Sequence, residues 1–168
     1  MHQTERLMML PFAPEHFNHL LDLFCNNKKV MTSALKGRVL SLKEFLRLLS
    51  EQFILSPKDD NGFLCLFNRQ NHQFVGVTGL LACHYLEQKD WEFGFILHQD
   101  YWGKGLATEI GNFWIDYAKN NKQLSRILAT TRPDNHLSKK VLKKLRMQEQ
   151  KTIFIKDRGQ RLVFVKDL

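Results

Sequence analysis

The amino-acid sequence predicts an α/β fold in which helices flank one mixed central sheet. Three observations lead to this prediction. Short apolar runs of strand length alternate with segments whose apolar residues recur at helical spacing. Neighbouring strand segments joined by short polar turns predict antiparallel hairpins, whereas strands separated by a helix predict parallel crossovers. The chain has 168 residues, which fits one domain, so we expect residues 1–168 to form a single domain.

The N-terminal part of the chain predicts one strand followed by two helices. Residues 5–10 are rich in apolar side chains and stop before two prolines, which predicts a short first strand. A helix is expected next from the apolar residues at helical spacing, which are Phe17, Leu20, Leu21 and Phe24. The second helix is expected to begin at Ser41, because Ser41 and Glu44 form an S-x-x-E capping box. Its apolar face consists of Phe45, Leu48 and Leu49.

The middle of the chain predicts a hairpin, a further strand and a long helix. Residues 62–68 and 73–82 are apolar runs on either side of a polar stretch suited to a hairpin loop. The next apolar run, residues 91–97, predicts the fourth strand. A glycine-containing segment then leads into a helix whose expected buried residues are Leu106, Ile110, Phe113, Trp114 and Tyr117.

The C-terminal part predicts a strand, a helix and a final hairpin. Residues 126–131 read as the fifth strand. A helix opens at Pro133 and Asp134, and its expected apolar face is Leu137, Val141, Leu142 and Leu145. Two last strands, 151–156 and 160–166, surround the turn at residues 157–159. The predicted order is therefore β-α-α-β-β-β-α-β-α-β-β.

Composition and charge exclude several classes of protein. The net charge of +8 favours anionic partners. The basic residues are spread out, however, and the sequence has no zinc-finger spacing or RNA-binding aromatic signature, so we do not expect nucleic acid as the main partner. We expect a cytoplasmic protein without a membrane span or signal peptide, because no apolar run approaches the required length. The cysteines Cys25, Cys65 and Cys83 form no metal-binding spacing, and no metal is expected.

The sharpest local feature is the glycine-containing segment from Trp102 to Thr108, between a strand and the long helix. Gly103 and Gly105 let the backbone approach a ligand without a Cβ in the way. The first turn of the helix leaves backbone N–H groups unpaired at the positive end of the helix dipole, which suits a pyrophosphate. The segment is neither a Walker A loop nor a G-x-G-x-x-G dinucleotide motif, and two glycines alone are equally typical of a tight strand-to-helix turn.

The residues around this segment resemble motif A of the GNAT acetyltransferases, with the consensus Q/R-x-x-G-x-G/A. The segments that carry the resemblance are residues 92–97 (EFGFIL) and 101–109 (YWGKGLATE), supported by 4–7 (TERL), 75–80 (VGVTGL), 132–138 (RPDNHLS) and 141–145 (VLKKL). They look most like the branch that acts on ribosomal proteins, the RimJ/RimL type, and together cover nearly the whole chain. The resemblance implies the GNAT fold, with a mostly antiparallel sheet of about seven strands and about four helices, splayed between strands four and five.

The resemblance also implies an acetyl-CoA site. Backbone groups of the fourth strand would bind the pantetheine arm, and this maps to Phe95, Ile96 and Leu97. Loop amides would bind the pyrophosphate, and these map to Gly103, Lys104, Gly105, Leu106, Ala107 and Thr108. Asn135 would contact the pantetheine arm, and Ser138 would bind the cofactor through its hydroxyl. The lysines on the helix after Asn135 form either a solvated face or a site for the 3′-phosphate of CoA.

Acetyl transfer requires a neutral amine, donors for the oxyanion and an acid for the leaving thiolate. Glu92 is the candidate base, acting directly or through a water molecule, with a solvated or salt-bridged strand residue as the alternative interpretation. Ser138 is the candidate acid, because Leu142 occupies the position where many family members carry a tyrosine. Arg146 stands where the family usually has a glycine that ends the helix in a left-handed conformation, so we expect the helix end to differ.

The sequence thus predicts an N-acetyltransferase that moves an acetyl group from acetyl-CoA to a primary amine. An α-amine, with a reference pKa of about 8, is easier to activate than a lysine side chain at about 10.4. The acceptor is expected to be a protein N-terminus or a small amine, and the protein a monomer or homodimer. The alternative is an acyl-CoA-binding module that lacks efficient catalysis.

Overall fold

The computed structural model describes residues 2–56, 59–156 and 158–168. Its strands form one eight-stranded sheet in the order β1-β2-β3-β4-β5-β6-β8-β7. They are β1 (His2–Gln3), β2 (Leu7–Leu10), β3 (Gly62–Asn68), β4 (Phe74–Cys83), β5 (Asp90–Leu97), β6 (Arg126–Thr131), β7 (Gln148–Ile155) and β8 (Gly159–Asp167). All neighbouring pairs are antiparallel except β5 and β6, which are parallel. The predicted mixed, mostly antiparallel sheet is confirmed, with β1 as an additional strand.

The described helices are α1 (Phe17–Leu21), α2 (Lys28–Met31), α3 (Leu42–Gln52), α4 (Leu106–Asn120) and α5 (His136–Lys144). The helix predicted around Phe17 is broken into pieces, because a π-helical turn, Asp22–Asn26, follows α1 and Asn27 then caps α2. The capping box at the start of α3 is confirmed in both directions between Ser41 and Glu44. No helix in the described parts of the chain is both long and apolar enough to cross a bilayer.

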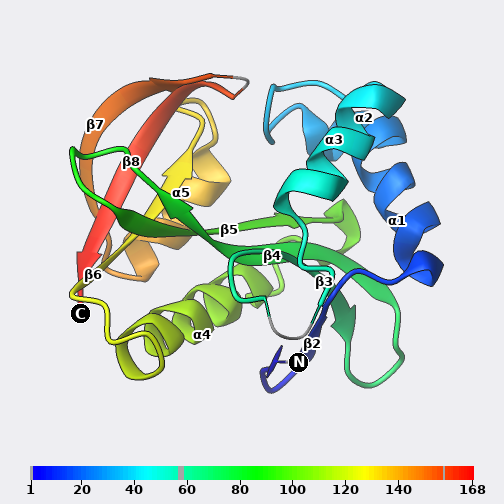
Figure 1. Cartoon of the computed structure of the whole chain (residues 1–168), viewed down its shortest axis with the longest axis horizontal. Coiled ribbons are helices and arrows are strands. Elements are labelled where there is room, and N and C mark those ends of the chain that lie inside the picture. The colour runs from blue at the N-terminus through cyan, green and yellow to red at the C-terminus, as the bar shows by residue number, and fades with distance from the viewer. Residues whose placement is uncertain (1, 57–58, 157) are drawn as a thin grey trace.

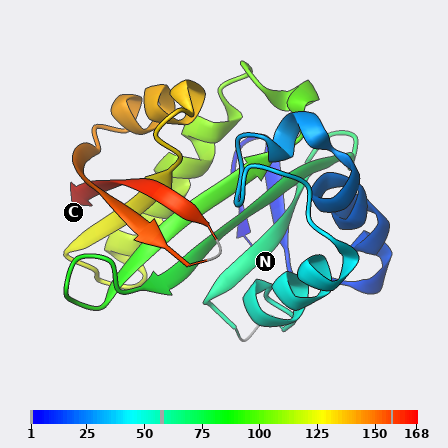
Figure 2. The same ribbon diagram turned by 90° about the horizontal axis from the view of Figure 1, so that it is seen from above.

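Helices cover both faces of the sheet, and the alternation of side chains in β3 shows why. Leu64 and Leu66 belong to the core beneath α4 and α5, whereas Phe63, Cys65 and Phe67 belong to the core beneath α1–α3. Figure 1 shows α4 on the opposite side of the sheet from α1–α3. In Figure 2 the N-terminal helices lie over one half of the molecule, and β6–β8 with α5 form the other half.

The N-terminal strand is shorter than predicted. Residues 5–10 were expected to be extended, but β2 begins at Leu7 because Thr4 and Leu7 close a turn: Thr4 N–H donates to Leu7 O at 2.9 Å and Leu7 N–H to Thr4 Oγ1 at 3.1 Å. This turn brings β1 beside β2. His2 then packs edge-on against Tyr117 and tilted against Phe113. These two rings of α4 are half-buried, whereas the sequence predicted them to be buried.

Helix α5 ends in the left-handed conformation despite its arginine, so the expected difference at this helix end does not occur. Arg146 has φ 57°. The N–H of Met147 donates to Leu142 O at 3.1 Å and that of Arg146 to Lys143 O at 3.0 Å, which is a Schellman motif. One predicted core residue of α5 is wrong, because Leu137 is 59% exposed. It faces the cavity described below.

Candidate active site

The sheet splays between β5 and β6. The ladder between β4 and β5 runs along the whole length of β5, whereas β5 and β6 pair at one position only, Glu92 opposite Leu128. The part of β5 after Glu92 therefore has no strand on its β6 side. The splay predicted between the fourth and fifth strands lies here.

The exposed edge of β5 presents particular backbone groups. His98 N–H donates to Val75 O across the β4–β5 ladder at 2.9 Å. Because backbone groups alternate in direction along a strand, those of Phe95 and Leu97 point away from β4 and into the splay. Leu97 O accepts a hydrogen bond from the Trp102 indole at 2.9 Å, whereas no described residue hydrogen-bonds to the backbone groups of Phe95. Ile96 directs its backbone to β4, so its predicted contact with a cofactor depends on its side chain.

The glycine-containing loop has the features of an anion site. Gly103 and Gly105 adopt left-handed conformations with φ 74° and 78°, which explains why glycine stands at both positions. Within the described chain, no protein group accepts a hydrogen bond from the N–H groups of residues 103–107. The loop itself is exposed up to Gly105, which caps α4. A concave run of free backbone N–H groups at a helix N-terminus is suited to a phosphate.

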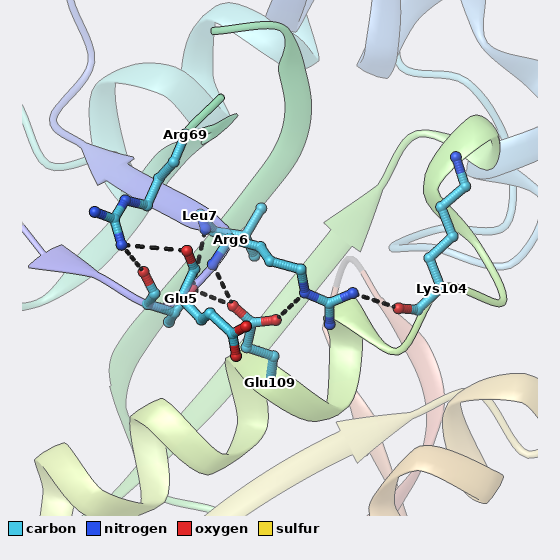
Figure 3. A network of polar contacts seen from close by, with 7 residues as sticks. Glu5, Arg6, Leu7, Arg69, Lys104 and Glu109 are labelled. Atoms are coloured by element: carbon cyan, nitrogen blue, oxygen red, sulfur yellow. Dashed lines mark hydrogen bonds and ion pairs between the residues drawn. The ribbon is translucent and has the colours of Figure 1, made fainter. Parts of the chain in front are cut away.

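The N-terminal turn braces this loop, and Figure 3 shows the contacts. Arg6 Nη1 donates to Lys104 O at 2.8 Å, and Arg6 Nε donates to Glu109 Oε2 at 2.6 Å. Glu109, in the first turn of α4, also accepts from Thr4 Oγ1 at 2.5 Å and from the N–H of Arg6 at 2.9 Å. The sequence of residues 4–7 (TERL) indicated only a resemblance to the family, and the role of this segment as a brace was not predicted.

The charge of Glu109 is matched within this brace. Burial alone would raise the pKa of Glu109, but hydrogen bonds from Thr4 and Arg6 hold it below its usual value. Glu109 is therefore ionised and paired with Arg6. Its negative charge is neutralised close to the loop, where it would otherwise repel a phosphate.

Asn135 and Ser138 lie at the start of α5. Asn135 caps the helix, since its Oδ1 accepts from Ser138 N–H at 3.1 Å, and its Nδ2 donates to Ser33 O at 3.2 Å. The Asn135 side chain thus ties α5 to the loop between α2 and α3. The Ser138 hydroxyl has no hydrogen-bond partner among the residues that the structure describes. Leu142, which stands where many family members carry a tyrosine, is buried in the core at 2% exposure.

Glu92 lies in a polar cluster at the point where β5 and β6 part. Its residue is 3% exposed. Its Oε1 accepts from Arg158 Nη1 at 2.7 Å and from the Tyr85 hydroxyl at 3.1 Å, while Oε2 accepts from Thr130 Oγ1 at 3.1 Å. The carboxylate is therefore buried, paired and positioned by groups on three other segments.

Two further arginines lie near Arg158. Arg132, directly after β6, pairs with Asp134 at 3.1 Å. Arg161 in β8 is 4% exposed and donates to Leu35 O. Burial, followed by the charges of Arg158 and Arg132, lowers the pKa of Arg161 to about 10. Sequence reasoning noted Arg158 only as part of a turn and did not single out Arg161.

One cavity of about 340 Å³ collects most of these groups. Of the predicted site residues, its lining includes Glu92, Phe95, Ile96, Leu97, Gly103, Gly105, Leu106, Ala107, Thr108, Asn135 and Ser138. Lys104 is absent from the lining. Its carbonyl accepts a hydrogen bond from Arg6, and its ammonium lies 5.4 Å from the Tyr101 ring centre. Lys140 and Lys144 of α5 also line the cavity, together with all three arginines.

Comparison with known proteins places this geometry among acetyltransferases. Residues 6–148 match the family described as "Acetyltransferase (GNAT) domain". The protein YkkB of Bacillus subtilis (strain 168), described as uncharacterized, is 29% identical over 86 residues, which are 51% of this chain and 50% of that protein. The chain thus spans about half the length of this relative.

Solved structures show the same fold. An acetyltransferase from Agrobacterium tumefaciens str. C58 superposes with a TM-score of 0.80 at 19% identity, covering 99% of this chain and 94% of that one. RimL, a ribosomal L7/L12 alpha-N-protein acetyltransferase in complex with coenzyme A, superposes with a TM-score of 0.74 at 16% identity, covering 98% and 96%.

Proposed function

Because the chain belongs to the GNAT acetyltransferase family, we propose that it transfers an acetyl group from acetyl-CoA to a primary amine. The observation that carries this proposal is the run of free N–H groups at residues 103–107 beside the open edge of β5. Together they supply an anion cradle and a set of backbone hydrogen-bonding groups within one cavity. Acetyl-CoA, with a pyrophosphate and an amide-containing arm, needs both.

In this proposal the loop amides bind the pyrophosphate and the backbone of Phe95 binds the pantetheine arm. Arg6 and Glu109 hold the loop in the required shape. Lys140 and Lys144 line the same cavity and supply positive charge for the remaining phosphate. The N–H of Phe95 is the candidate donor to the oxyanion of the tetrahedral intermediate.

Glu92 is the proposed proton acceptor. It is the only carboxylate in the described lining of the cavity, which contains no histidine. A carboxylate offers about four lone-pair positions, and Tyr85, Arg158 and Thr130 use three of them. No other described residue bonds to the fourth position, which lies on Oε2. Arg158 supplies a countercharge to the buried Glu92 carboxylate.

Ser138 is the proposed proton donor to the leaving thiolate. Its hydroxyl is half-buried in the cavity lining and has no competing hydrogen bond in the described structure. The leucine at position 142, where many family members carry a tyrosine, favours a second candidate function, an acyl-CoA-binding protein without efficient turnover. The α-amine acceptor of the structural neighbour RimL supports a transferase that acts on α-amines.

The first experiment is calorimetric titration with acetyl-CoA, comparing the wild type with Gly105→Glu. A glutamate there would place a negative charge at the loop and would have to adopt φ 78°. Wild-type binding that the variant loses supports the proposed cofactor site. Thiol release with a panel of amines then separates the two functions. Binding without release from any amine favours the second function, and no binding by folded wild type refutes both.

A further inference from the structure

The end of the cavity around Glu92 carries more positive than negative charge. Arg132, Arg158 and Arg161 all line it. Among the described residues, the carboxylates that pair with these arginines are Glu92 and Asp134. About 16 Å of strand separates Glu92 from Leu97, at a rise of about 3.3 Å per residue. This cationic end is therefore distinct from the glycine-containing loop that follows β5.

Arg161 forms no ion pair with any residue that the structure describes, although the charges of Glu92 and Asp134 act on it from a distance. Arg132 and Arg158 each form an ion pair, whereas the one hydrogen bond of Arg161 in the described structure runs to a neutral acceptor, the carbonyl of Leu35. A buried arginine without a paired carboxylate is unusual, because the desolvation of its charge is then only partly compensated. The adjacent positive charges of Arg158 and Arg132 add to this cost.

The remaining N–H groups of Arg161 open into the cavity. Among the described residues, Gln52 Oε1 is the only fully enclosed side-chain polar atom without a hydrogen-bond partner. The unbonded nitrogens of Arg161 are therefore not sealed in the core, and Arg161 is part of the cavity wall. A planar guanidinium with free N–H groups matches a carboxylate.

We infer that the acceptor of the proposed transfer is a small primary amine that also carries a carboxylate, such as a free amino acid, and that Arg161 binds this carboxylate. The inference rests on the proposed function and specifies its substrate class. The ligand carboxylate would supply the missing negative charge, and the amine of the same molecule would then lie in the cavity that Glu92 also lines. A polyamine would instead place its additional ammonium groups among three guanidiniums.

Matched pairs of amines test the inference. Thiol release from acetyl-CoA is measured with L-leucine against L-leucinamide and L-methionine against L-methioninamide, with spermidine as the polycation. An aspartyl and an asparaginyl dipeptide amide test whether a side-chain carboxylate suffices. We expect kcat/KM for each free amino acid to exceed that of its amide by about tenfold to a hundredfold, the range for a hydrogen bond to a charged group.

Variants assign the preference to one side chain. Arg161→Met should abolish the preference for the carboxylated member of each pair, and Arg161→Lys should keep part of it. Arg47→Met, which replaces an exposed arginine of α3 outside the cavity lining, is the control and should keep all of it. Should Arg161→Met fail to fold, the matched pairs on the wild type and on Arg161→Lys still decide the question.

Three results would overturn the inference. They are equal turnover of amino acids and their amides, preferred turnover of spermidine, and a preference confined to the aspartyl dipeptide. Failure of the proposed function looks different, because then no amine of any charge releases the thiol. Acetyl-CoA titration of each variant shows in addition whether the cofactor site is intact.

Discussion

The brace between the N-terminal turn and the glycine-containing loop makes a quantitative prediction for Arg6→Met. The substitution removes the hydrogen bond to Lys104 O and the ion pair to Glu109. The Arg6 side chain is 45% exposed, so the ion pair contributes less than 1 kcal/mol. The hydrogen bond contributes about 1 kcal/mol. We therefore expect the free energy of unfolding to fall by about 1–2 kcal/mol and Tm to fall by about 3–6 °C.

The same change should weaken acetyl-CoA binding. Arg6→Met releases Lys104, and it leaves the Glu109 carboxylate unpaired beside the site proposed for the pyrophosphate. If the loop geometry is coupled to binding, a loss of this size raises Kd by about fivefold to thirtyfold. Adding Glu109→Gln removes the unpaired charge, so the double variant should bind more tightly than Arg6→Met alone.

Calorimetric titration with acetyl-CoA, together with thermal unfolding of each variant, measures both effects. Arg69→Met is the matched control, since Arg69 contacts the backbone of Thr4 and Glu5 in the same network without contacting α4 or the loop (Figure 3). It should change Tm but leave Kd alone. An Arg6→Met variant with a lower Tm and wild-type affinity would refute the idea that the brace shapes the loop.

Further predictions concern stability. Arg146→Gly should raise Tm by about 2–4 °C, because it removes about 1 kcal/mol of left-handed strain; an unchanged or lower Tm would contradict the strain. Arg126→Met should lower the free energy of unfolding by about 3–5 kcal/mol in urea denaturation, because it leaves Asp90, 5% exposed, without its bidentate partner; a loss below 1 kcal/mol would show that Asp90 can be solvated. Stability should fall as the pH drops below about 4. Burial alone would raise the pKa values of Asp90 and Glu109, but hydrogen bonds to their carboxylates lower both pKa values below the usual range. Hydrogen bonds from Arg38 and Lys36 likewise lower the pKa of Glu44. Lowered folded-state values give stability that is present at neutral pH and lost as these groups protonate. Urea denaturation from pH 7 to pH 3 measures this, and constant stability would contradict it.

The features that the sequence predicted well are those that depend on residues close together in the chain. The capping box of α3 lies within four residues, and Gly103 and Gly105 are needed for local backbone conformation. The bounds of β3 and β6 depend on short apolar runs and match the prediction. In each case the relevant interaction is between neighbours in the chain, where periodicity and turn chemistry are informative.

The features that were missed depend on register between distant strands. Arg158 reaches Glu92 across 66 positions of sequence, and only the β6–β8 pairing brings it there. From the sequence alone, Arg158 is a turn residue and Arg161 belongs to an ordinary strand. The two glutamates were equally hard to separate: Glu92 and Glu109 both stand in the resemblance to motif A, yet one lines the cavity and the other fastens the N-terminal turn.

The single pairing position between β5 and β6 divides the sheet into two half-sheets whose union depends on side chains. Beyond Glu92 and Leu128, the junction includes the Asp90–Arg126 ion pair, the contacts of Glu92 with Thr130 and Arg158, and the tether from Asn135 to Ser33. A bound molecule that hydrogen-bonds to the free edge of β5 would act as a substitute strand and join the halves. Tighter cofactor binding and greater resistance to unfolding would then have the same physical cause, because both would depend on completing the sheet at the edge of β5.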